Sequence, residues 1–356
     1  MHQPIAAQRL RNQHLTTAFR AEPAGLVAHM GAVQAQEFPF AKWGLAQRLG
    51  RGCVDADVEK AFTAGRILRT HVLRPTWHFV AADDIRWMLD LTGPRVMRTV
   101  ISWTRREGID GRTLRRAATL FERALAGGVT LTRPELGERL RRGKIVASAP
   151  QMAFVTMYAE LEAVVCSGPR RGSQFTYALV AERAPRVSRM PFDDSLAELT
   201  RRYFCSHGPA TIRDFVWWSG LTVGETRRGL DMIRATRRTV DGLDYWSTGE
   251  VDARPGAAVH LLPIYDEYLV AYRDRVAVPH GPGRVGASGG GVTFRHALVS
   301  GGEVVGTWNV RAGRQGWALT VTPMRRLSRA ERDGVAVAVA RFARFLGESI
   351  DLTFAG

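Results

Sequence analysis

Residues 66–80, RILRTHVLRPTWHFV, decide the fold that this sequence predicts. Both halves of the segment are rich in β-branched and aromatic residues, and Arg74-Pro75 between them is a turn signal, so the segment predicts a β-hairpin. Three short helices are expected before the hairpin, over residues 23–35, 39–49 and 55–64. Short helices followed by a hairpin are the order of elements in a winged helix-turn-helix unit.

The same order of elements returns twice along the chain. Residues 112–183 predict three helices, over 112–128, 132–143 and 151–164, and then a two-stranded wing. Residues 195–247 predict helices over 196–208, 210–221 and 222–235, and then a hairpin that turns at Asp241-Gly242. Three such units are an internal structural repeat. Winged helices mostly bind nucleic acid, although some serve as protein–protein scaffolds.

Strand-like runs dominate the chain from about residue 254. They are AAVHLLPI (257–264), YLVAY (268–272), VTFRHALV (292–299), EVVGTWNV (303–310) and GWALTV (316–321). A small β-barrel or sheet is expected here. A helix is expected over 325–347, with its apolar residues 335, 339, 342 and 346 close to one face and packed on the barrel, and a last short strand follows.

The predicted fold class is therefore α+β, with three tandem winged helix-turn-helix units followed by a small C-terminal β-barrel. The predicted domains are residues 1–100 (first winged helix), 101–190 (second), 191–252 (third) and 253–356 (barrel with the C-terminal helix).

The charge of the chain points to a polyanionic partner. Fifty Lys and Arg residues against 34 Asp and Glu residues give a net charge of +16. The excess is spread over the whole chain, with no basic tail. Only Lys42, Lys60 and Lys144 are lysines, so part of the excess reflects a general preference for arginine codons. The charge favours DNA over a protein scaffold role.

Several classes of protein are excluded by missing motifs. The N-terminus has no apolar signal-peptide region and no window is long and apolar enough for a membrane span, so a cytoplasmic protein is expected. The three cysteines form no CxxC pair and the nine histidines form no HExxH pair, so no metal is expected. No phosphate-binding glycine loop is present, and no cofactor is expected.

Gln34-Ala35-Gln36 is one candidate for chemistry. Glutamines at i and i+2 diverge on a helix but share one face of an extended segment, so they converge on a ligand only where the helix ends. Pro39 pushes Phe38 out of helical geometry and favours such an ending. Two neutral amides, each a donor and an acceptor, can then aim at one water or leaving group. The alternative, which the bare pattern favours, is a pair of ordinary surface residues.

The second candidate is the hairpin segment from His71 to His78. It brings Arg74, Thr76, Trp77 and His78 into the tip and the return strand, where they suit phosphate contact and base stacking. The alternative is a packed Trp77 and a histidine satisfied by a backbone carbonyl. A third candidate is the turn that carries Arg311 and Arg314, which either projects into a DNA groove or is an exposed turn with incidental arginines.

Over nearly its whole length the sequence resembles the winged-helix DNA glycosylases of the AlkZ/YcaQ group, of the azinomycin-resistance type. The matching segments are QAQ (34–36), RTHVLRPTWHFV (69–80), SGPRRG (167–172), RYFCSHGPATIRDFVWWSGL (202–221), LLPIYDEYLVAYRDR (261–275) and VVGTW (304–308). Other branches carry Asp at the second position of the QAQ motif, and this chain does not. That difference places it nearer the branch that acts on bulky antibiotic adducts.

The resemblance implies a fold and a function. The three winged helices would form a C-shaped, basic cleft closed by the barrel, with Gln34 and Gln36 as catalytic residues at its centre. The expected DNA-binding residues are Arg69, His71, Arg74, Thr76, Trp77, His78, Arg311 and Arg314. The expected partner is double-stranded DNA that carries alkylated purines, and the expected state is a monomer in the bacterial cytoplasm, at the nucleoid.

The implied reaction is hydrolysis of the N-glycosidic bond of N7-alkylated guanine, in bulky natural-product adducts or interstrand crosslinks, by a monofunctional glycosylase. Alkylation at N7 makes the purine a good leaving group, so amides suffice without a general acid. One glutamine would orient the attacking water and the other would support the charge that develops on the sugar. Two alternatives stay open: a non-catalytic DNA-binding regulator or drug-sequestering protein, and an enzyme that uses Asp266 and Glu267.

Overall fold

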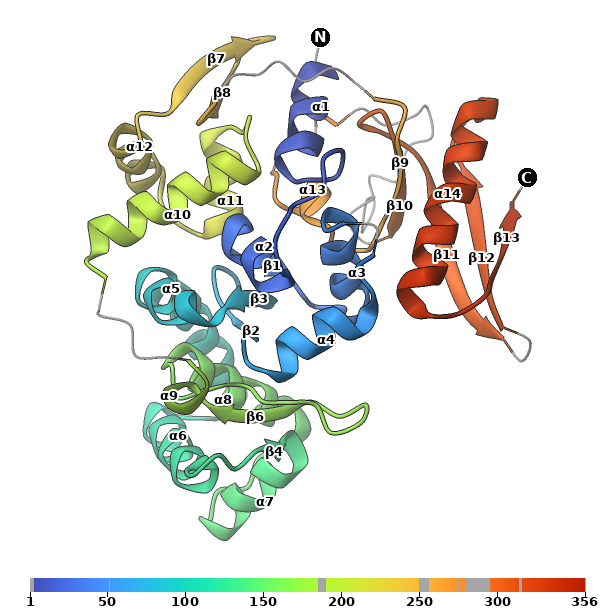
Figure 1. The fold of residues 1–356 in the computed structure, drawn as a ribbon. Helices are drawn as coiled ribbons and strands as arrows, with labels where there is room; N and C mark the ends of the chain where they lie inside the picture. Colours follow the sequence, from blue (N-terminus) through green and yellow to red (C-terminus); the bar gives the residue numbers. More distant parts are fainter. Residues whose placement is uncertain are drawn as a thin grey trace.

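The computed structural model describes residues 3–50, 52–184, 190–249, 256–273, 276–278, 295–313 and 316–355. The chain is a mixed α+β protein (Figure 1), as predicted. Helices and short antiparallel hairpins alternate along most of it, and a sheet covered by a long helix forms its C-terminal part. Within these described ranges, no helix combines the length and the apolar character that a bilayer crossing requires.

The first part of the chain contains the predicted helices and hairpin. Its elements are α1 (Gln3–Asn12), α2 (Pro23–Met30), β1 (Val33–Gln34), α3 (Phe38–Arg48), α4 (Asp55–Thr63), β2 (Ile67–His71), β3 (Trp77–Ala81) and a 3-10 turn (Ala82–Asp84). The hairpin pairs Ile67 with Ala81 and His71 with Trp77. Strand β1 adds a third strand beside β3, giving the order β1-β3-β2.

The helix predicted over 23–35 is too long. Helix α2 ends at Met30 because Gly31 has a φ of 80°, a conformation that glycine adopts without strain. The chain then becomes extended and pairs with the hairpin as β1. The prediction missed this change because strand β1 is only two residues long.

The second part repeats the order of helices and hairpin. Its elements are α5 (Ile85–Arg106), α6 (Gly111–Leu125), β4 (Leu131–Thr132), α7 (Arg133–Arg142), α8 (Ala149–Leu161), β5 (Val165–Ser167), β6 (Thr176–Leu179) and α9 (Val180–Arg183). Thr132 caps α7 through a reciprocal pair of hydrogen bonds with Glu135, as its position in the sequence predicts. Helix α5 has no counterpart in the sequence prediction.

The third part has the same order again. Its elements are α10 (Phe192–Ser206), α11 (Ile212–Ser219), α12 (Val223–Met232), β7 (Thr236–Val240) and β8 (Leu243–Ser247). Asp241 and Gly242 both have positive φ values, 50° and 77°, which confirms the predicted hairpin turn.

The C-terminal part is an open sheet in the described ranges, where a closed barrel was expected. Its elements are β9 (Val259–Leu262), α13 (Glu267–Val270), β10 (His296–Ser300), β11 (Glu303–Gly313), β12 (Gly316–Pro323), α14 (Arg329–Leu346) and β13 (Ile350–Phe354). The strand order β13-β12-β11-β10-β9 leaves two edges, and only the pair β12 and β13 is parallel. Residues 292–294 of the predicted strand at 292–299 lie outside the described residues.

One predicted strand is wrong. Residues 268–272, YLVAY, belong mostly to helix α13, because the side chain of Asp266 accepts a hydrogen bond from the backbone N–H of Tyr268 at 2.9 Å and caps a helical turn. The predicted C-terminal helix is confirmed as α14, and its residues Val335 and Phe342 pack against the sheet.

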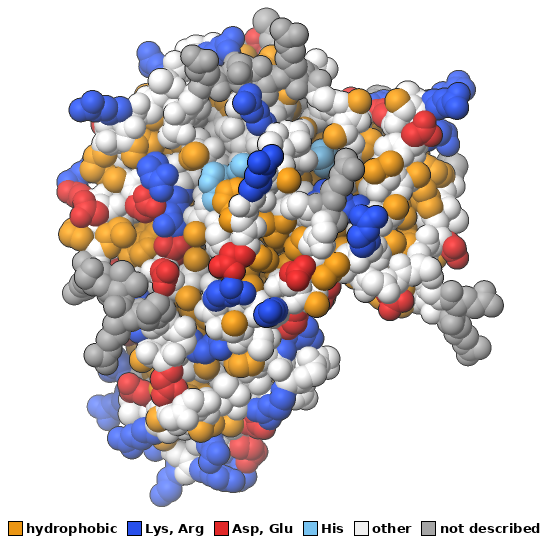
Figure 2. Space-filling model, viewed as in Figure 1, with side chains coloured by type: hydrophobic (Ala, Val, Ile, Leu, Met, Phe, Trp, Pro, Cys, Tyr) orange, Lys and Arg blue, Asp and Glu red, His pale blue; other side chains and the backbone are white. Residues whose placement is uncertain are grey.

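The first part lies between the second and third parts of the chain (Figure 1). One continuous hydrophobic core joins all three, with Leu68 from β2, Met157 from α8 and Leu199 from α10 among its members. Lys and Arg side chains are scattered over the face shown in Figure 2, with acidic side chains among them. The fold therefore places β1 and its glutamines near the middle of the molecule.

Candidate active site

The glutamine pair lies on an extended segment. Gln34 pairs with His78 across the sheet, and the backbone N–H of Ala35 donates to the carbonyl of Trp77 at 2.7 Å. Side chains at i and i+2 of an extended segment point to the same side. Strand β1 ends at Gln34 and Gln36 lies in the bend that follows, so the convergence of the two amides on one ligand stays a prediction.

The two glutamines differ in their surroundings. Gln34 is nearly buried, whereas Gln36 is exposed. The Oε1 atom of Gln34 accepts a hydrogen bond from Nη2 of Arg74 at 3.2 Å, and Oε1 of Gln36 accepts from the backbone N–H of Trp77 at 3.4 Å. Each amide oxygen thus accepts a hydrogen bond from the hairpin that β2 and β3 form. Neither amide nitrogen takes part in these two contacts.

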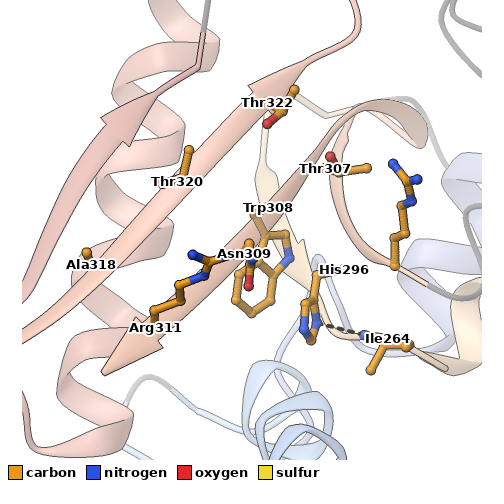
Figure 3. A pocket seen from close by; sticks show the side chains of 10 residues that line it. Ile264, His296, Thr307, Trp308, Asn309, Arg311, Ala318, Thr320 and Thr322 are labelled. Carbon is orange, nitrogen blue, oxygen red and sulfur yellow. Dashed lines mark hydrogen bonds between the residues drawn. The ribbon is translucent and has the colours of Figure 1, made fainter. Parts of the chain in front are cut away.

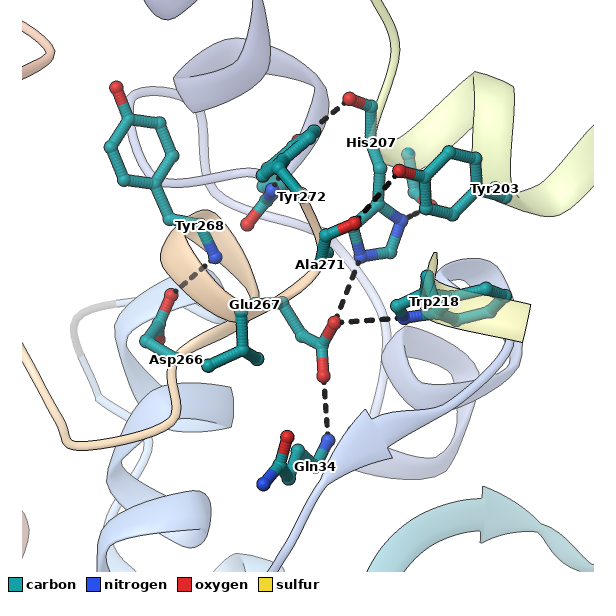
Figure 4. A network of polar contacts seen from close by, with 12 residues as sticks. Gln34, Tyr203, His207, Trp218, Asp266, Glu267, Tyr268, Ala271 and Tyr272 are labelled. Carbon is teal, nitrogen blue, oxygen red and sulfur yellow. Dashed lines mark hydrogen bonds and ion pairs between the residues drawn. The ribbon is translucent and has the colours of Figure 1, made fainter. Parts of the chain in front are cut away.

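A buried carboxylate lies directly under Gln34 (Figure 4). Oε1 of Glu267 accepts the backbone N–H of Gln34 at 2.7 Å, and Oε2 accepts Nε1–H of Trp218 at 3.0 Å. Nε2 of His207 lies 3.4 Å from the same Oε2. Glu267 begins α13, while Trp218 and His207 come from the third part of the chain, so three distant segments meet beneath β1.

The Glu267 carboxylate is held in its charged form. Burial acts to raise the pKa of Glu267, but hydrogen bonding and charge interaction with His207, the charge of Arg74 and the N–H of Gln34 lower that pKa below its ordinary value. Burial lowers the pKa of His207, and the hydrogen bond and charge interaction with Glu267 act against that shift. The site behind Gln34 therefore contains one buried negative charge, with Arg74 as the nearby cation.

Asp266, the neighbour of Glu267, has a different partner. It forms a buried ion pair with Arg48, whose Nη2 and Nη1 lie 2.7 and 2.8 Å from its two carboxylate oxygens. None of the hydrogen bonds of Asp266 within the described residues goes to Gln34 or Gln36. The sequence offered no local sign of the pairing, because Arg48 lies 218 residues away.

Arg69 supports the glutamine segment from the side. Its Nε donates to the carbonyl of Ala35 at 3.0 Å and its Nη2 to the carbonyl of Gln36 at 3.3 Å. The guanidinium stacks over the rings of Trp77 and Phe175, at 4.2 and 4.6 Å. Burial lowers the pKa of Arg69 to about 10, which still leaves it charged at pH 7.

Both histidines of the hairpin are buried. His71 pairs through Nδ1 with Glu160 of α8, and its ring lies against Trp77. Nδ1 of His78 hydrogen-bonds to the carbonyl of Thr76 at 2.8 Å, and burial, followed by the charge of Arg74, lowers the pKa of His78 to about 3. His71 is 4% exposed and His78 has no exposed surface, and contact of either with DNA stays a prediction.

The other hairpin residues are partly accessible. Thr76, Trp77 and Arg74 are each half-buried. Trp77 is packed between His71 and Arg69, which agrees with the packing alternative given for it above. Trp77 and Arg69 also line a hollow of about 450 Å³ with Phe175 and Tyr177 from the second part of the chain. The hollow is therefore lined by two residues, Arg69 and Trp77, that hydrogen-bond to Gln36.

The C-terminal sheet carries a second hollow, of about 640 Å³ (Figure 3). Its lining residues are Ile264, Arg295, His296, Thr307, Trp308, Asn309, Arg311, Ala318, Thr320 and Thr322. Arg311 and Arg295 are exposed there, and threonine hydroxyls surround them. Arg314 lies outside the described residues. The alternation of Thr307, Asn309 and Arg311 was a visible signal for this polar face, which the sequence prediction missed.

In the described part of the chain, no three His, Cys, Asp or Glu side chains gather in a way that could hold a metal ion.

Comparisons with known proteins place the chain among DNA glycosylases. The model of the AlkZ-like DNA glycosylase family matches residues 27–345. An interstrand DNA cross-link repair glycosylase of Streptomyces sahachiroi is 26% identical over 368 aligned positions, which cover 97% of this chain and 96% of that protein. The solved structure of Streptomyces sahachiroi DNA glycosylase AlkZ has the same fold, with a TM-score of 0.76, 23% identity and 99% of each chain covered. The chain belongs to the AlkZ-like family of DNA glycosylases.

Proposed function

We propose that this DNA glycosylase hydrolyses the N-glycosidic bond of N7-alkylated guanine, in bulky adducts and interstrand crosslinks, with Gln34 and Gln36 as its catalytic residues. One observation carries the proposal: the two glutamines lie on one segment whose backbone is held by Glu267, Arg69 and β3, and both amide oxygens accept hydrogen bonds from the hairpin at Arg74 and Trp77. A fixed backbone keeps both amides in place before the substrate binds, and preorganised polar groups are the main source of enzymatic rate enhancement.

The chemistry suits neutral amides. An alkyl group at N7 gives the purine a positive charge, and when the C1′–N9 bond breaks the purine leaves with the bonding electron pair as a neutral base. The sugar is left as an oxocarbenium ion, which adds water at C1′, and the added water then loses one proton to solvent. No proton has to be delivered to the leaving base, so a general acid is not needed.

The DNA-binding surface is part of the same proposal. The three units of helices and hairpin act as tandem winged helices around a basic cleft in which Gln34 and Gln36 lie. Arg311, Arg314 and the hydroxyl-rich face of the C-terminal sheet contact phosphates, and the hollow next to Trp77 receives part of a bulky adduct. An open cleft of this kind tolerates lesions that cannot be flipped into a snug pocket.

The similarity to the Streptomyces sahachiroi protein supports the crosslink as a substrate, since that relative is named an interstrand cross-link repair glycosylase. The glutamine at the second position of the motif supports the same choice. We propose that the protein acts as a monomer on chromosomal DNA in the cytoplasm.

The test is release of free base under single-turnover conditions. Duplex DNA with one N7-methylguanine, and a second duplex with an N7-guanine interstrand crosslink from a nitrogen mustard, are incubated with excess protein. Free alkylated base and an abasic strand are expected from the first, and unhooked single strands from the second. Tight binding without free base from either duplex would overturn the proposal and favour a drug-sequestering DNA-binding protein.

A further inference from the structure

We propose that Arg74 is a positioning residue, which holds the amide of Gln34 so that its NH₂ group faces the substrate as a hydrogen-bond donor. The inference rests on the proposed function, because it assigns a chemical role to one of the two glutamines. It also gives Arg74 a role other than the DNA contact that the sequence suggested.

The tip of the hairpin is docked inside the protein. The carbonyl of Leu73 lies so close to Gly220 that a Cβ atom at residue 220 would come within 2.8 Å of it. Leu73 itself is 2% exposed and its N–H donates to Oγ1 of Thr92 at 3.2 Å. A hairpin tip that is locked between α5 and α11 cannot reach out to DNA, and Arg74 is fixed with it.

The guanidinium of Arg74 can bind only one end of a glutamine amide. Arginine has five N–H donors and no acceptor, so the only atom of a glutamine amide that it can hold is the oxygen. The contact of 3.2 Å between Nη2 of Arg74 and Oε1 of Gln34 therefore fixes which end of the amide faces the protein. The backbone N–H of Gln34 is taken by Glu267, so the side-chain NH₂ is the hydrogen-bond donor of Gln34 left for a ligand.

The positive charge of Arg74 is compensated by a nearby carboxylate. A half-buried arginine next to a cationic substrate would oppose binding unless a negative charge compensates it. Glu267 supplies that charge: burial lowers the pKa of Arg74, and Glu267 acts against this shift. Arg74 contacts the side chain of Gln34 and Glu267 contacts its backbone. The two opposite charges together add no net charge to the site.

The chemical consequence is a division of roles between the glutamines. As the C1′–N9 bond breaks, the electron pair raises the electron density at N3 and O6 of the purine, and an N–H donor stabilises that density. The oxygen of Gln34 faces Arg74, so the NH₂ group is the end of this amide that we assign to the leaving base. Gln36 is exposed and its side-chain oxygen accepts a contact of 3.4 Å from the backbone N–H of Trp77, so we assign it the orientation of the water.

A double-mutant cycle tests the inference. Base release from N7-methylguanine DNA is measured for Arg74→Met, for Gln34→Ala and for the combined variant, with melting temperatures recorded in parallel. We expect each single change to slow release on the order of tenfold to a hundredfold, and the combined variant to be no slower than Gln34→Ala within about twofold, because Arg74 acts only through Gln34. Arg171→Met, at an exposed arginine paired with Glu135, is the matched control and should keep the wild-type rate.

The outcomes are distinguishable. If the combined variant loses the product of the two single effects, Arg74 acts independently and the inference is overturned. If Arg74→Met does not fold, the same cycle with Arg74→Lys decides. Gln34→Glu is a second test, because its carboxylate keeps the contact with Arg74 but cannot donate a hydrogen bond. Base release should be as slow as in Gln34→Ala. A wild-type rate of release would overturn the inference. A wild-type protein that releases no base overturns the proposed function as well.

Discussion

The carboxylate of Glu267 accepts the backbone N–H of Gln34 at 2.7 Å, so a residue at the start of α13 fixes the strand that ends at the first glutamine of the pair. The two residues are 233 positions apart. The same carboxylate accepts the indole N–H of Trp218 from α11, which ties the third part of the chain to the same point. The geometry of the site is therefore a property of the whole fold, and changes far from the glutamines in sequence should alter it.

Replacing Glu267 by Gln should destabilise the protein. The new amide can accept only at its oxygen, and its NH₂ group would face either the N–H of Gln34 or that of Trp218, so one buried donor loses its acceptor. An unsatisfied buried donor costs about 1–3 kcal/mol, and Arg74 would lose its compensating charge in addition. We expect the free energy of unfolding in urea to fall by at least this amount.

Glu138→Gln is the matched control for that measurement. Glu138 is exposed and pairs only with Arg141 three residues away, so its loss should change the free energy of unfolding by less than about 0.5 kcal/mol. Equal effects of the two substitutions would contradict the role given to Glu267.

The local elements of the fold could be predicted from the sequence, because their signals are local. The hairpin at 66–80, the turn at Asp241-Gly242 and the cap at Thr132 each depend on residues a few positions apart. The strand predicted at 268–272 failed because a single cap, Asp266, outweighs a β-branched and aromatic pattern.

The supports of the site could not be predicted. Arg48 with Asp266, His71 with Glu160 and Gln34 with Glu267 are pairs between distant segments, and a charged residue in the sequence looks the same whether it will be exposed or buried. The burial of His71 and His78 and the partial burial of Arg74 could not be predicted either, because docking of the hairpin on its neighbours decides it.

Acid should destabilise the protein through His78. This histidine is buried with its pKa lowered to about 3, whereas an unfolded histidine takes up a proton near its ordinary value of 6.5. The unfolded state therefore binds more protons than the folded state between these values, and stability falls as the pH falls below about 6.5. We expect the His78 contribution to the loss between pH 7 and pH 5 to be on the order of 1–2 kcal/mol.

His78→Asn checks this contribution. An asparagine amide can replace Nδ1–H in the hydrogen bond to the carbonyl of Thr76 but takes up no proton. Denaturant unfolding at pH 7 and pH 5 should give a smaller difference for the variant than for the wild type. An unchanged difference would mean that other buried histidines carry the acid sensitivity.

DNA binding should be strongly salt-dependent and show little sequence preference. The net charge of +16 is spread over the chain, and phosphate contacts release counterions, so log K should fall linearly with log salt concentration. Arg311→Ala should reduce the slope by about one unit. Arg344→Ala, at an exposed residue near the end of α14, should leave the slope unchanged. An affinity independent of salt would contradict the prediction.

The glutamine pair is open to the sharpest test. Gln34→Ala and Gln36→Ala should each slow base release on the order of a hundredfold, because each removes a preorganised amide from the reacting bond. Gln36 is exposed, so its truncation should change the free energy of unfolding by less than about 0.5 kcal/mol, while Gln34→Ala should cost about 1 kcal/mol because Arg74 loses a partner. DNA affinity should stay close to that of the wild type in both variants, so a slow rate cannot be attributed to unfolding or to weak binding.

Gln36→Glu should retain more activity than Gln36→Ala, since a carboxylate can still accept a hydrogen bond from water. Full single-turnover excision by both alanine variants, on an adduct that the wild type releases, would show that the pair is structural.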